Sequence, residues 1–254
     1  DKTWAAEEMS RVGEERFKRE HLCEPVIFDE TLINSLTLME MTGSDPLQKQ
    51  GQVRWWKTPE KGKIYVVALD PSLGTGGDNS AMQVYELPEM IQVAEWMHNK
   101  TTIQRQVRIL AEITKYISEA IQDQYNVYYS VENNTLGEAA LVSISEIGEE
   151  NIHGIFLSEP YKPGNARRFR KGFNTTNKSK LTACAKMKNL IESNRMSINS
   201  KTLIGELKHF VANGSSYAAK PGEKDDLVMS TVLALRMSVT LQSYDPEIQK
   251  RLQD

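Results

Sequence analysis

Cysteine and histidine are scarce in this sequence of 254 residues, and no hydrophobic run is long. The two cysteines, Cys23 and Cys184, are too few for a disulfide framework or a cysteine-rich zinc site. The apolar run from Ile64 to Leu69 is far shorter than the ~20 residues of a membrane-spanning helix. The charged first residues are not typical of a signal peptide. The sequence therefore excludes a disulfide-rich scaffold and a membrane-spanning protein.

The chain also lacks a strong excess of one charge. Its 31 basic and 34 acidic residues give a formal net charge of -3, which argues against a protein that wraps nucleic acid over its whole surface. A local basic patch remains compatible with this balance. The composition, 39% hydrophobic and 26% charged, is that of an ordinary globular domain. Because the chain begins at Asp1 and not at Met, we expect it to be a piece of a longer protein.

Patterning predicts two regions. Residues 4–42 combine a helix with interleaved acidic and basic residues and a short apolar segment. Residues 43–62 are rich in glycine, proline and polar residues, which is typical of a linker. From residue 63 onward the pattern is mixed α/β. We therefore place a boundary between a first region, 1–60, and a second, 61–254.

The second region has an order of elements that can be read from hydrophobic spacing. Strands over 63–69, 80–87 and 92–98 have short connections, which predicts an antiparallel meander. A helix over 102–122, a strand over 127–131, a helix near 136–147 and a short strand over 152–157 predict a crossover unit. We expect an exposed loop or hairpin over 161–176. Helices are then predicted over 179–193, 201–212 and 225–241, and the last must be largely buried because it is apolar on almost every side.

Acidic residues stand at the ends of these apolar elements. Asp70 ends the first strand, Glu132 ends the strand over 127–131, and Asp225 and Asp226 open the last helix. Buried carboxylates are costly unless they are compensated, and hard divalent cations compensate them well. Two such ions can activate a water and stabilise a leaving oxygen in phosphodiester hydrolysis. The set therefore predicts a divalent-metal centre.

Each acidic residue also has a simpler interpretation. Asp70 precedes Pro71 and can begin a turn, Glu132 can belong to an ordinary loop, and Asp225 can cap a helix. It is their combination, in this order of elements, that favours the metal centre. The glycine loop after Asp70 lacks the third glycine of a dinucleotide motif and the Gly-Lys-Ser/Thr ending of a P-loop. We interpret Asp78 in this loop as an accessory metal ligand.

No acidic residue occurs between Pro160 and Ile191, although basic and aromatic residues are frequent there. Such side chains contact phosphates, and no base-reading motif accompanies them, so binding should be largely independent of base sequence. The alternative is a solvated loop and helix face. The candidate contacts to a DNA backbone are Arg167, Arg168, Arg170, Lys171, Lys178 and Lys180.

At these motifs the chain resembles the C-terminal nuclease region of the large terminase subunit of tailed bacteriophages, especially the T-even-like group. The resemblance covers about residues 14–240, and its most specific motif is Asp225–Ser230. The other segments that carry it are Glu15–His21, Thr31–Ile33, Val66–Asp70 with the loop to Asp78, Val131–Thr135 and Ser216–Ala219.

The resemblance implies an RNase H-like α/β fold, a mixed β-sheet flanked by helices. It implies a metal-dependent endonuclease that cuts concatemeric viral double-stranded DNA during genome packaging, in the host cell cytoplasm. The family's catalytic acidic residues fall on Asp70, Glu132 and Asp226, with Asp225 adjacent, and two Mg²⁺ or Mn²⁺ ions are the implied cofactors. The implied partners are the portal protein, the small terminase subunit and the packaging ATPase domain. Residues 1–60 would then be the tail of that ATPase domain and a linker, without ATPase activity.

Two other functions remain open at this point. Holliday-junction resolvases use the same acidic layout, and selective cutting of junctions would distinguish them. The piece can also be a docking module for the portal or motor with weak activity of its own. Metal-dependent cleavage by the isolated chain would separate that function from a nuclease.

Overall fold

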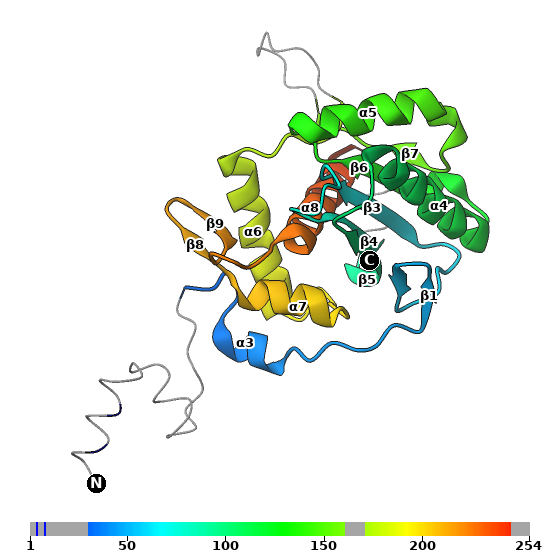
Figure 1. Ribbon diagram of the computed structural model, residues 1–254. Helices are drawn as coiled ribbons and strands as arrows, with labels where there is room; N and C mark the ends of the chain where they lie inside the picture. Colours follow the sequence, from blue (N-terminus) through cyan, green and yellow to red (C-terminus); the bar gives the residue numbers. More distant parts are fainter. Residues whose placement is uncertain (1–3, 5–7, 9–29, 161–170, 245–254) are drawn as a thin grey trace.

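The computed structural model describes residues 4, 8, 30–160 and 171–244, which are drawn in colour in Figure 1. A seven-stranded mixed sheet lies at its centre, with the strand order β1-β2-β5-β4-β3-β6-β7. Among the described residues, no helix combines the length and hydrophobicity that crossing a membrane requires.

The central strands form as their sequences predict. β3 (Ile64–Asp70), β4 (Ser80–Leu87) and β5 (Ile91–His98) pair as an antiparallel meander. β6 (Val127–Val131) is parallel to β3, and the short β7 (Ile155–Phe156) is parallel to β6. These parallel pairs confirm the predicted crossover. They also bring the carboxyl ends of β3 and β6 to the same edge of the sheet.

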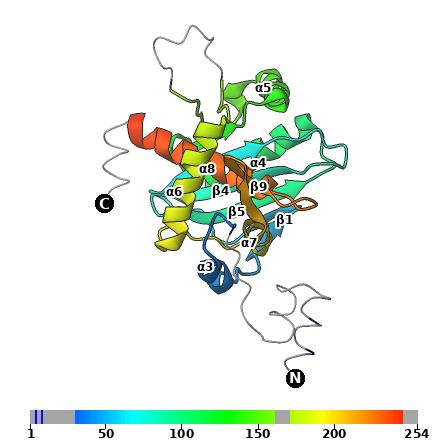
Figure 2. The ribbon, with the colours of Figure 1, turned by 90° about the vertical axis from the view of Figure 1, so that its left-hand side faces the viewer.

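Helices cover both faces of the sheet (Figures 1 and 2). α4 (Ile103–Ile121) and α5 (Thr135–Ile147) share one hydrophobic core with Val67 and Leu69 of β3. The opposite core contains Val66 and Ala68. It is covered by α6 (Asn177–Glu192), α7 (Lys201–Lys208) and α8 (Asp226–Tyr244). Successive β3 side chains alternate between these cores, as a strand requires. α8 packs on β3 and β4 with α6 and α7 beside it, which explains why it is apolar almost all round.

The prediction that residues 43–62 form a linker is wrong. β1 (Gln48–Gln50) and β2 (Val53–Trp55) lie in this segment, and β2 extends the sheet by pairing with β5. The preceding short helix α3 (Ser35–Glu40) places Leu38 in the core. The part of the first region that the structure describes thus packs with the second. Its proposed origin in an ATPase domain stays a prediction.

The predicted helix over 201–212 is too long. α7 ends at Lys208, and a hairpin of β8 (Phe210–Asn213) and β9 (Ser216–Ala219) follows. Gly214, which follows Asn213, adopts a φ of +58°, the left-handed conformation that a tight hairpin turn needs. Two short 3₁₀ helices, Gln124–Asn126 and Glu149–Asn151, precede β6 and β7. Of the expected loop over 161–176, residues 161–170 lie outside the described chain.

Candidate metal centre

Asp70 and Glu132 stand at the carboxyl ends of the neighbouring parallel strands β3 and β6. Leu69 is paired with Val131, and the Glu132 backbone N–H donates to the Leu69 carbonyl oxygen at 2.9 Å. This register brings the two carboxyl groups together. Burial raises the pKa of Asp70 well above its usual range, and the adjacent Glu132 carboxylate raises it further.

Asp225 and Asp226 reach the same place from α8. The Ser230 hydroxyl, in the first turns of α8, donates to the Ala68 carbonyl oxygen of β3 at 2.9 Å and so anchors the helix start to this strand. The negative charges of both aspartates contribute to the raised pKa of Asp70. Three elements distant in sequence therefore bring Glu132, Asp225 and Asp226 within electrostatic reach of Asp70, and the role of these four residues as metal ligands stays a prediction.

Asp226 is held by the end of the glycine loop. Its Oδ2 accepts hydrogen bonds from the Asn79 side-chain amide at 2.8 Å and from the Asn79 backbone N–H at 3.3 Å. Burial raises the pKa of Asp226, and the Asn79 hydrogen bonds oppose that rise. The Oδ2 of Asp225 accepts instead from the Ala219 N–H of β9 at 3.3 Å.

The acidic side chains have the oxygen ligands that a divalent cation prefers, but they are not spaced as the ligands of a bound ion. Across 30–160 and 171–244, no three Asp, Glu, His or Cys side chains are spaced as ligands of one metal ion. Burial raises the pKa of Asp70 and of Asp226, and the negative charges of neighbouring carboxylates add to both rises. Hard cations with oxygen ligands relieve such repulsion. Asp70, Glu132, Asp225 and Asp226 are thus the residues that can hold a metal.

Asp78 lies at the edge of this cluster. Its side chain is 80% exposed and forms an ion pair of 2.7 Å with Lys224, the residue before Asp225. The loop that carries Asp78 is docked on the turn after β5. There, a Cβ at Gly74 would lie 2.1 Å from the Thr101 carbonyl oxygen, so only glycine fits. The loop therefore holds Asp78 and Asn79 beside the start of α8.

Backbone packing encloses the turn that carries Glu132. A Cβ at Gly137, in the first turn of α5, would lie 1.9 Å from the Glu132 carbonyl oxygen. On the other side, the Phe173 N–H donates to the Val131 carbonyl oxygen at 3.2 Å, and the Asn133 N–H donates to the Phe173 carbonyl oxygen at 2.7 Å. The Glu132 side chain is 7% exposed. Its backbone therefore has little freedom to move.

Glu206 is a residue near the site that the sequence analysis missed. It lies on α7, is 8% exposed, and its Oε2 accepts a hydrogen bond of 3.0 Å from the Val228 N–H in the first turn of α8. Burial raises its pKa to about 8, and Asp226 and Asp225 contribute to the rise. A sequence signal existed, because Glu206 follows the buried Leu203 by three residues and so shares its helical face.

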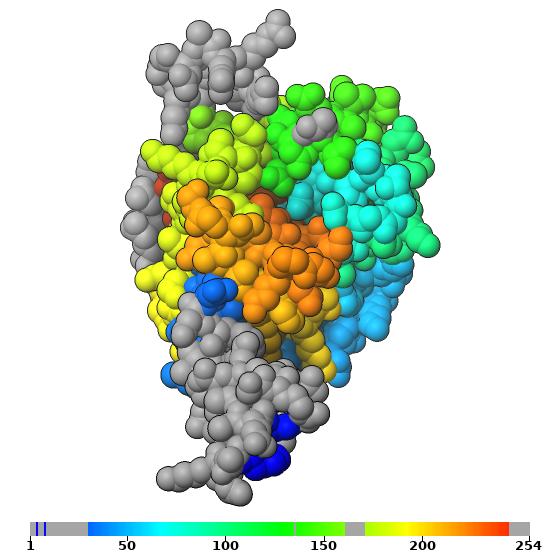
Figure 3. Space-filling view, turned by 60° about the vertical axis from the view of Figure 1, so that its left-hand side comes forward, coloured from blue at the N-terminus to red at the C-terminus, as the bar shows by residue number. Residues whose placement is uncertain are grey.

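The predicted basic strip is only partly described. Arg167, Arg168 and Arg170 lie outside the described residues. Lys171 forms an ion pair with Glu149, and Lys178 is exposed at the start of α6. Lys180, in the first turn of α6, lies 5.4 Å from the centre of the Phe210 ring of the β8–β9 hairpin, and α6 packs on α8, the helix that begins with Asp226. Figure 3 shows the face on which α6 and the β8–β9 hairpin lie side by side.

Comparison with known proteins agrees with this architecture. Residues 67–238 match the family described as the terminase RNaseH-like domain. The large terminase nuclease of thermophilic phage G20c with bound magnesium has a TM-score of 0.59 and 20% identity, over 82% of this chain and 97% of that one. The same nuclease is also known with bound cobalt and with bound zinc.

Two further nucleases share the fold. The Thermus phage P74-26 large terminase nuclease domain has a TM-score of 0.56 and 20% identity, over 83% of this chain and 95% of that one. The manganese-soaked human cytomegalovirus terminase nuclease domain has a TM-score of 0.54 and 12% identity, over 86% of this chain and 98% of that one. These structures confirm the expected RNase H-like fold. With the family match over most of its length, this chain belongs to the terminase RNase H-like domains, the nuclease domains of large terminase subunits.

Proposed function

We propose that this nuclease domain cuts concatemeric viral double-stranded DNA during packaging, with two divalent ions and little dependence on base sequence. The observation that carries the proposal is the meeting of Asp70 and Glu132 on neighbouring parallel strands, within the electrostatic reach of Asp225 and Asp226. Asp70, Glu132 and Asp226 are the proposed catalytic metal ligands. Asp225 and Asp78 are proposed to assist, and Mg²⁺ or Mn²⁺ is the proposed metal.

The chain's own residues prepare this chemistry. Bound divalent ions supply an activated water and offset the charge on the leaving oxygen. Asp70 and Glu132 present carboxylate oxygens at a partly buried edge of the sheet, and Asn79 orients Asp226. Because no three of the described acidic side chains are spaced as ligands of one ion, the proposal includes a movement of side chains when the metal binds. The metal-bound structures of related nucleases support a divalent cation.

DNA contact is proposed for the basic strip. Phosphates are contacted by lysine and arginine side chains whatever the base sequence. Lys178 and Lys180 lie at the start of α6, which packs on α8, and are the described members that we propose for this role. Lys171 is engaged by Glu149 and must leave this ion pair to contact DNA. Arg167, Arg168 and Arg170 complete the proposed strip.

The proposed context is a packaging motor of the T-even-like type in the host cytoplasm. There the domain would work with the packaging ATPase domain, the portal protein and the small terminase subunit. The glycine loop of this chain lacks a P-loop sequence, so the proposed activity of the piece itself is DNA cleavage without ATP hydrolysis.

Plasmid cleavage by an Asp70→Asn variant tests this proposal. We expect the wild-type chain to cut supercoiled and linear plasmid in Mg²⁺ or Mn²⁺, and the variant to lose cleavage while it keeps most DNA binding. Asp45→Asn is the matched control, because Asp45 is 87% exposed and pairs with Lys201 away from the cluster. Equal cleavage by Asp70→Asn and wild type would refute the catalytic role. Cutting restricted to four-way junctions would favour a resolvase, and inactivity of the wild type would favour a docking module.

A further inference from the structure

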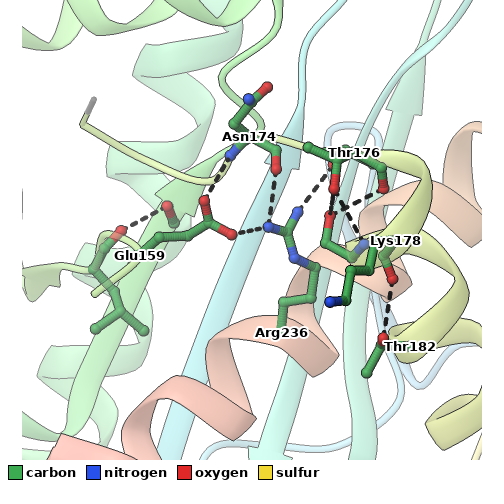
Figure 4. A network of polar contacts seen from close by, with 10 residues as sticks. Glu159, Asn174, Thr176, Lys178, Thr182 and Arg236 are labelled. Carbon is green, nitrogen blue, oxygen red and sulfur yellow. Dashed lines mark hydrogen bonds and ion pairs between the residues drawn. The ribbon is translucent and has the colours of Figure 1, made fainter. Parts of the chain in front are cut away.

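Arg236 joins two parts of the molecule that meet at the acidic cluster. It lies on α8, ten residues after Asp226, and is 8% exposed. Its guanidinium forms an ion pair with Glu159 and donates to the Thr175 hydroxyl at 3.0 Å and to the Asn174 carbonyl oxygen at 3.1 Å. Figure 4 shows the Arg236 guanidinium facing the Glu159 carboxylate and Asn174.

The acceptors of Arg236 belong to two segments that are tied to each other. The Glu159 N–H donates to the Gly172 carbonyl oxygen at 3.1 Å, and the Gly172 N–H donates to the Ser158 hydroxyl at 3.0 Å. The segments 157–159 and 171–175 therefore form one paired unit. Arg236 contacts both sides of this unit and lies 5.2 Å from the centre of the Phe173 ring.

The same unit is bonded to the backbone around Glu132. Phe173 forms a parallel bridge with Glu132 through hydrogen bonds to Val131 and Asn133. The approach is close, because a Cβ at Gly172 would lie 2.8 Å from the Val131 carbonyl oxygen. A path of hydrogen bonds and backbone thus runs from Arg236 through Asn174 and Phe173 to the turn that carries Glu132.

Stability alone does not require an arginine at this position. A buried ion pair is often no more stable than well-packed apolar side chains of similar volume. A guanidinium instead offers several donors in a fixed planar arrangement, which sets the relative position of its acceptors. Here the acceptors are on the segment beside Glu132, while the arginine is on the helix that begins with Asp226.

We propose that Arg236 is a positioning residue of the nuclease, which fixes Glu132 relative to Asp226 by clamping the segments 157–159 and 171–175 to α8. This inference rests on the proposed roles of Glu132 and Asp226 as metal ligands. Among the described residues, the partners of Arg236 are Glu159, Asn174, Thr175 and the Phe173 ring, and neither Glu132 nor Asp226 is one of them, so its effect is transmitted through Phe173.

The test compares Arg236→Met with Arg54→Met. Arg54 is the matched control, because it also pairs with a buried glutamate, Glu95, at 2.8 Å, but on β2, near the opposite edge of the sheet from β6. The readouts are the thermal midpoint, Mn²⁺ affinity from the electron paramagnetic resonance of free Mn²⁺, and amide exchange at Asn133 and Phe173. We expect Arg236→Met to weaken Mn²⁺ binding by about tenfold or more and to speed exchange at both amides. Arg54→Met should lose stability without either effect.

Two further variants keep the test decisive. Arg236→Lys keeps the charge opposite Glu159 but not the forked donors, so it should restore Mn²⁺ affinity only in part. Glu159→Gln breaks the ion pair from its partly exposed end and should shift the readouts in the same direction, even where Arg236→Met does not fold. Unchanged Mn²⁺ affinity and amide exchange in both Arg236→Met and Glu159→Gln would overturn the inference. If the wild type binds no Mn²⁺, it is the proposed function that fails, whereas amide exchange at Asn133 still tests the clamp.

Discussion

The Asn79 side-chain amide donates a hydrogen bond of 2.8 Å to Oδ2 of Asp226, which joins the end of the glycine loop to the first turn of α8. The two residues are far apart in sequence, and the loop between β3 and β4 brings them together. The contact gives the glycine loop a structural role that does not involve nucleotide binding. It presents a donor that orients an acidic side chain.

We therefore expect Asn79→Ala to weaken metal binding and cleavage by about tenfold, because partners that orient a metal ligand typically contribute that much. Titration calorimetry with Mn²⁺ and plasmid cleavage measure the two effects. Asn99→Ala is the control, since the Asn99 amide donates at 3.3 Å to the Gly76 carbonyl oxygen of the same loop but does not contact Asp226. Equal losses in the two variants would show that Asn79 only supports the loop.

The raised pKa of Asp70 predicts that the neutral Asp70→Asn variant is more stable than wild type, by an amount that depends on pH. The folded protein keeps a proton that the unfolded chain releases, so the stability contributed by Asp70 falls as the pH rises above its usual value. Asp70→Asn should therefore melt at a higher temperature than wild type at pH 8, by about 2–4 °C for each kcal/mol that the buried charge and the neighbouring carboxylates cost. The difference should shrink toward pH 4.

Differential scanning calorimetry without and with Mn²⁺ checks this prediction. Added Mn²⁺ should raise the melting temperature of the wild type at pH 8 and have less effect on Asp70→Asn, because the variant has lost a ligand. A variant less stable than wild type at pH 8 would show that the Asp70 carboxylate is not under repulsion.

The raised pKa of Glu206 on α7 predicts a second effect of pH on stability. Its pKa of about 8 means that stability declines between about pH 4.5 and 8, as the buried carboxyl group loses its proton. Glu206→Gln should flatten the profile of stability against pH over this interval, because an amide does not titrate. The amide oxygen can still accept the hydrogen bond from the Val228 N–H. Glu206→Ala should cost about 1–3 kcal/mol at pH 6, because it leaves that donor unsatisfied. Urea unfolding at several pH values measures both, and identical profiles of wild type and Glu206→Gln would disprove the assignment.

Two helical glycines offer a matched pair of alanine substitutions. Gly137→Ala places a Cβ 1.9 Å from the Glu132 carbonyl oxygen, whereas Gly205→Ala on α7 meets no atom within 4 Å. We expect Gly137→Ala to destabilise the fold by about 1–3 kcal/mol and to reduce cleavage, since the Glu132 turn must move. Gly205→Ala should stabilise by about 1 kcal/mol, as alanine favours a helix. Chemical unfolding and plasmid cleavage of both variants test this, and an active, fully stable Gly137→Ala would contradict it.

Local patterns were enough to predict the elements that build the acidic cluster. The apolar run of β3 and the short connections to β4 and β5 determine the meander, and the carboxyl ends of β3 and β6 meet because parallel strands share an edge. The positions of the acidic residues at element ends predicted a shared metal centre, but not that β3 and β6 are neighbouring strands. The catalytic roles of Asp70, Glu132 and Asp226 could only be inferred from the resemblance.

The features that the sequence did not reveal depend on distant partners. β2 is a strand because Arg54 and Trp55 pair with Glu95 and Ala94 of β5. The polar and glycine-rich residues around β2 do not predict this pairing. The spacing of Glu206 from Leu203 indicates only that it faces the core, and the contacts of Glu206 with Val228 and of Arg236 with Glu159 depend on the tertiary structure. Asn213 and Gly214 are a typical turn sequence and could have predicted the hairpin after α7. The helical spacing of the preceding residues led instead to the prediction of a longer helix.

The central claim is that Asp70, Glu132 and Asp226 bind divalent cations together. Anomalous diffraction from a crystal soaked in Mn²⁺ tests it most directly. We predict two anomalous peaks among these three carboxylates, with Asp225 close to one of them, and none in a crystal of Asp70→Asn soaked in the same way. Peaks found only elsewhere on the protein, or none at any Mn²⁺ concentration that supports cleavage, would contradict the account.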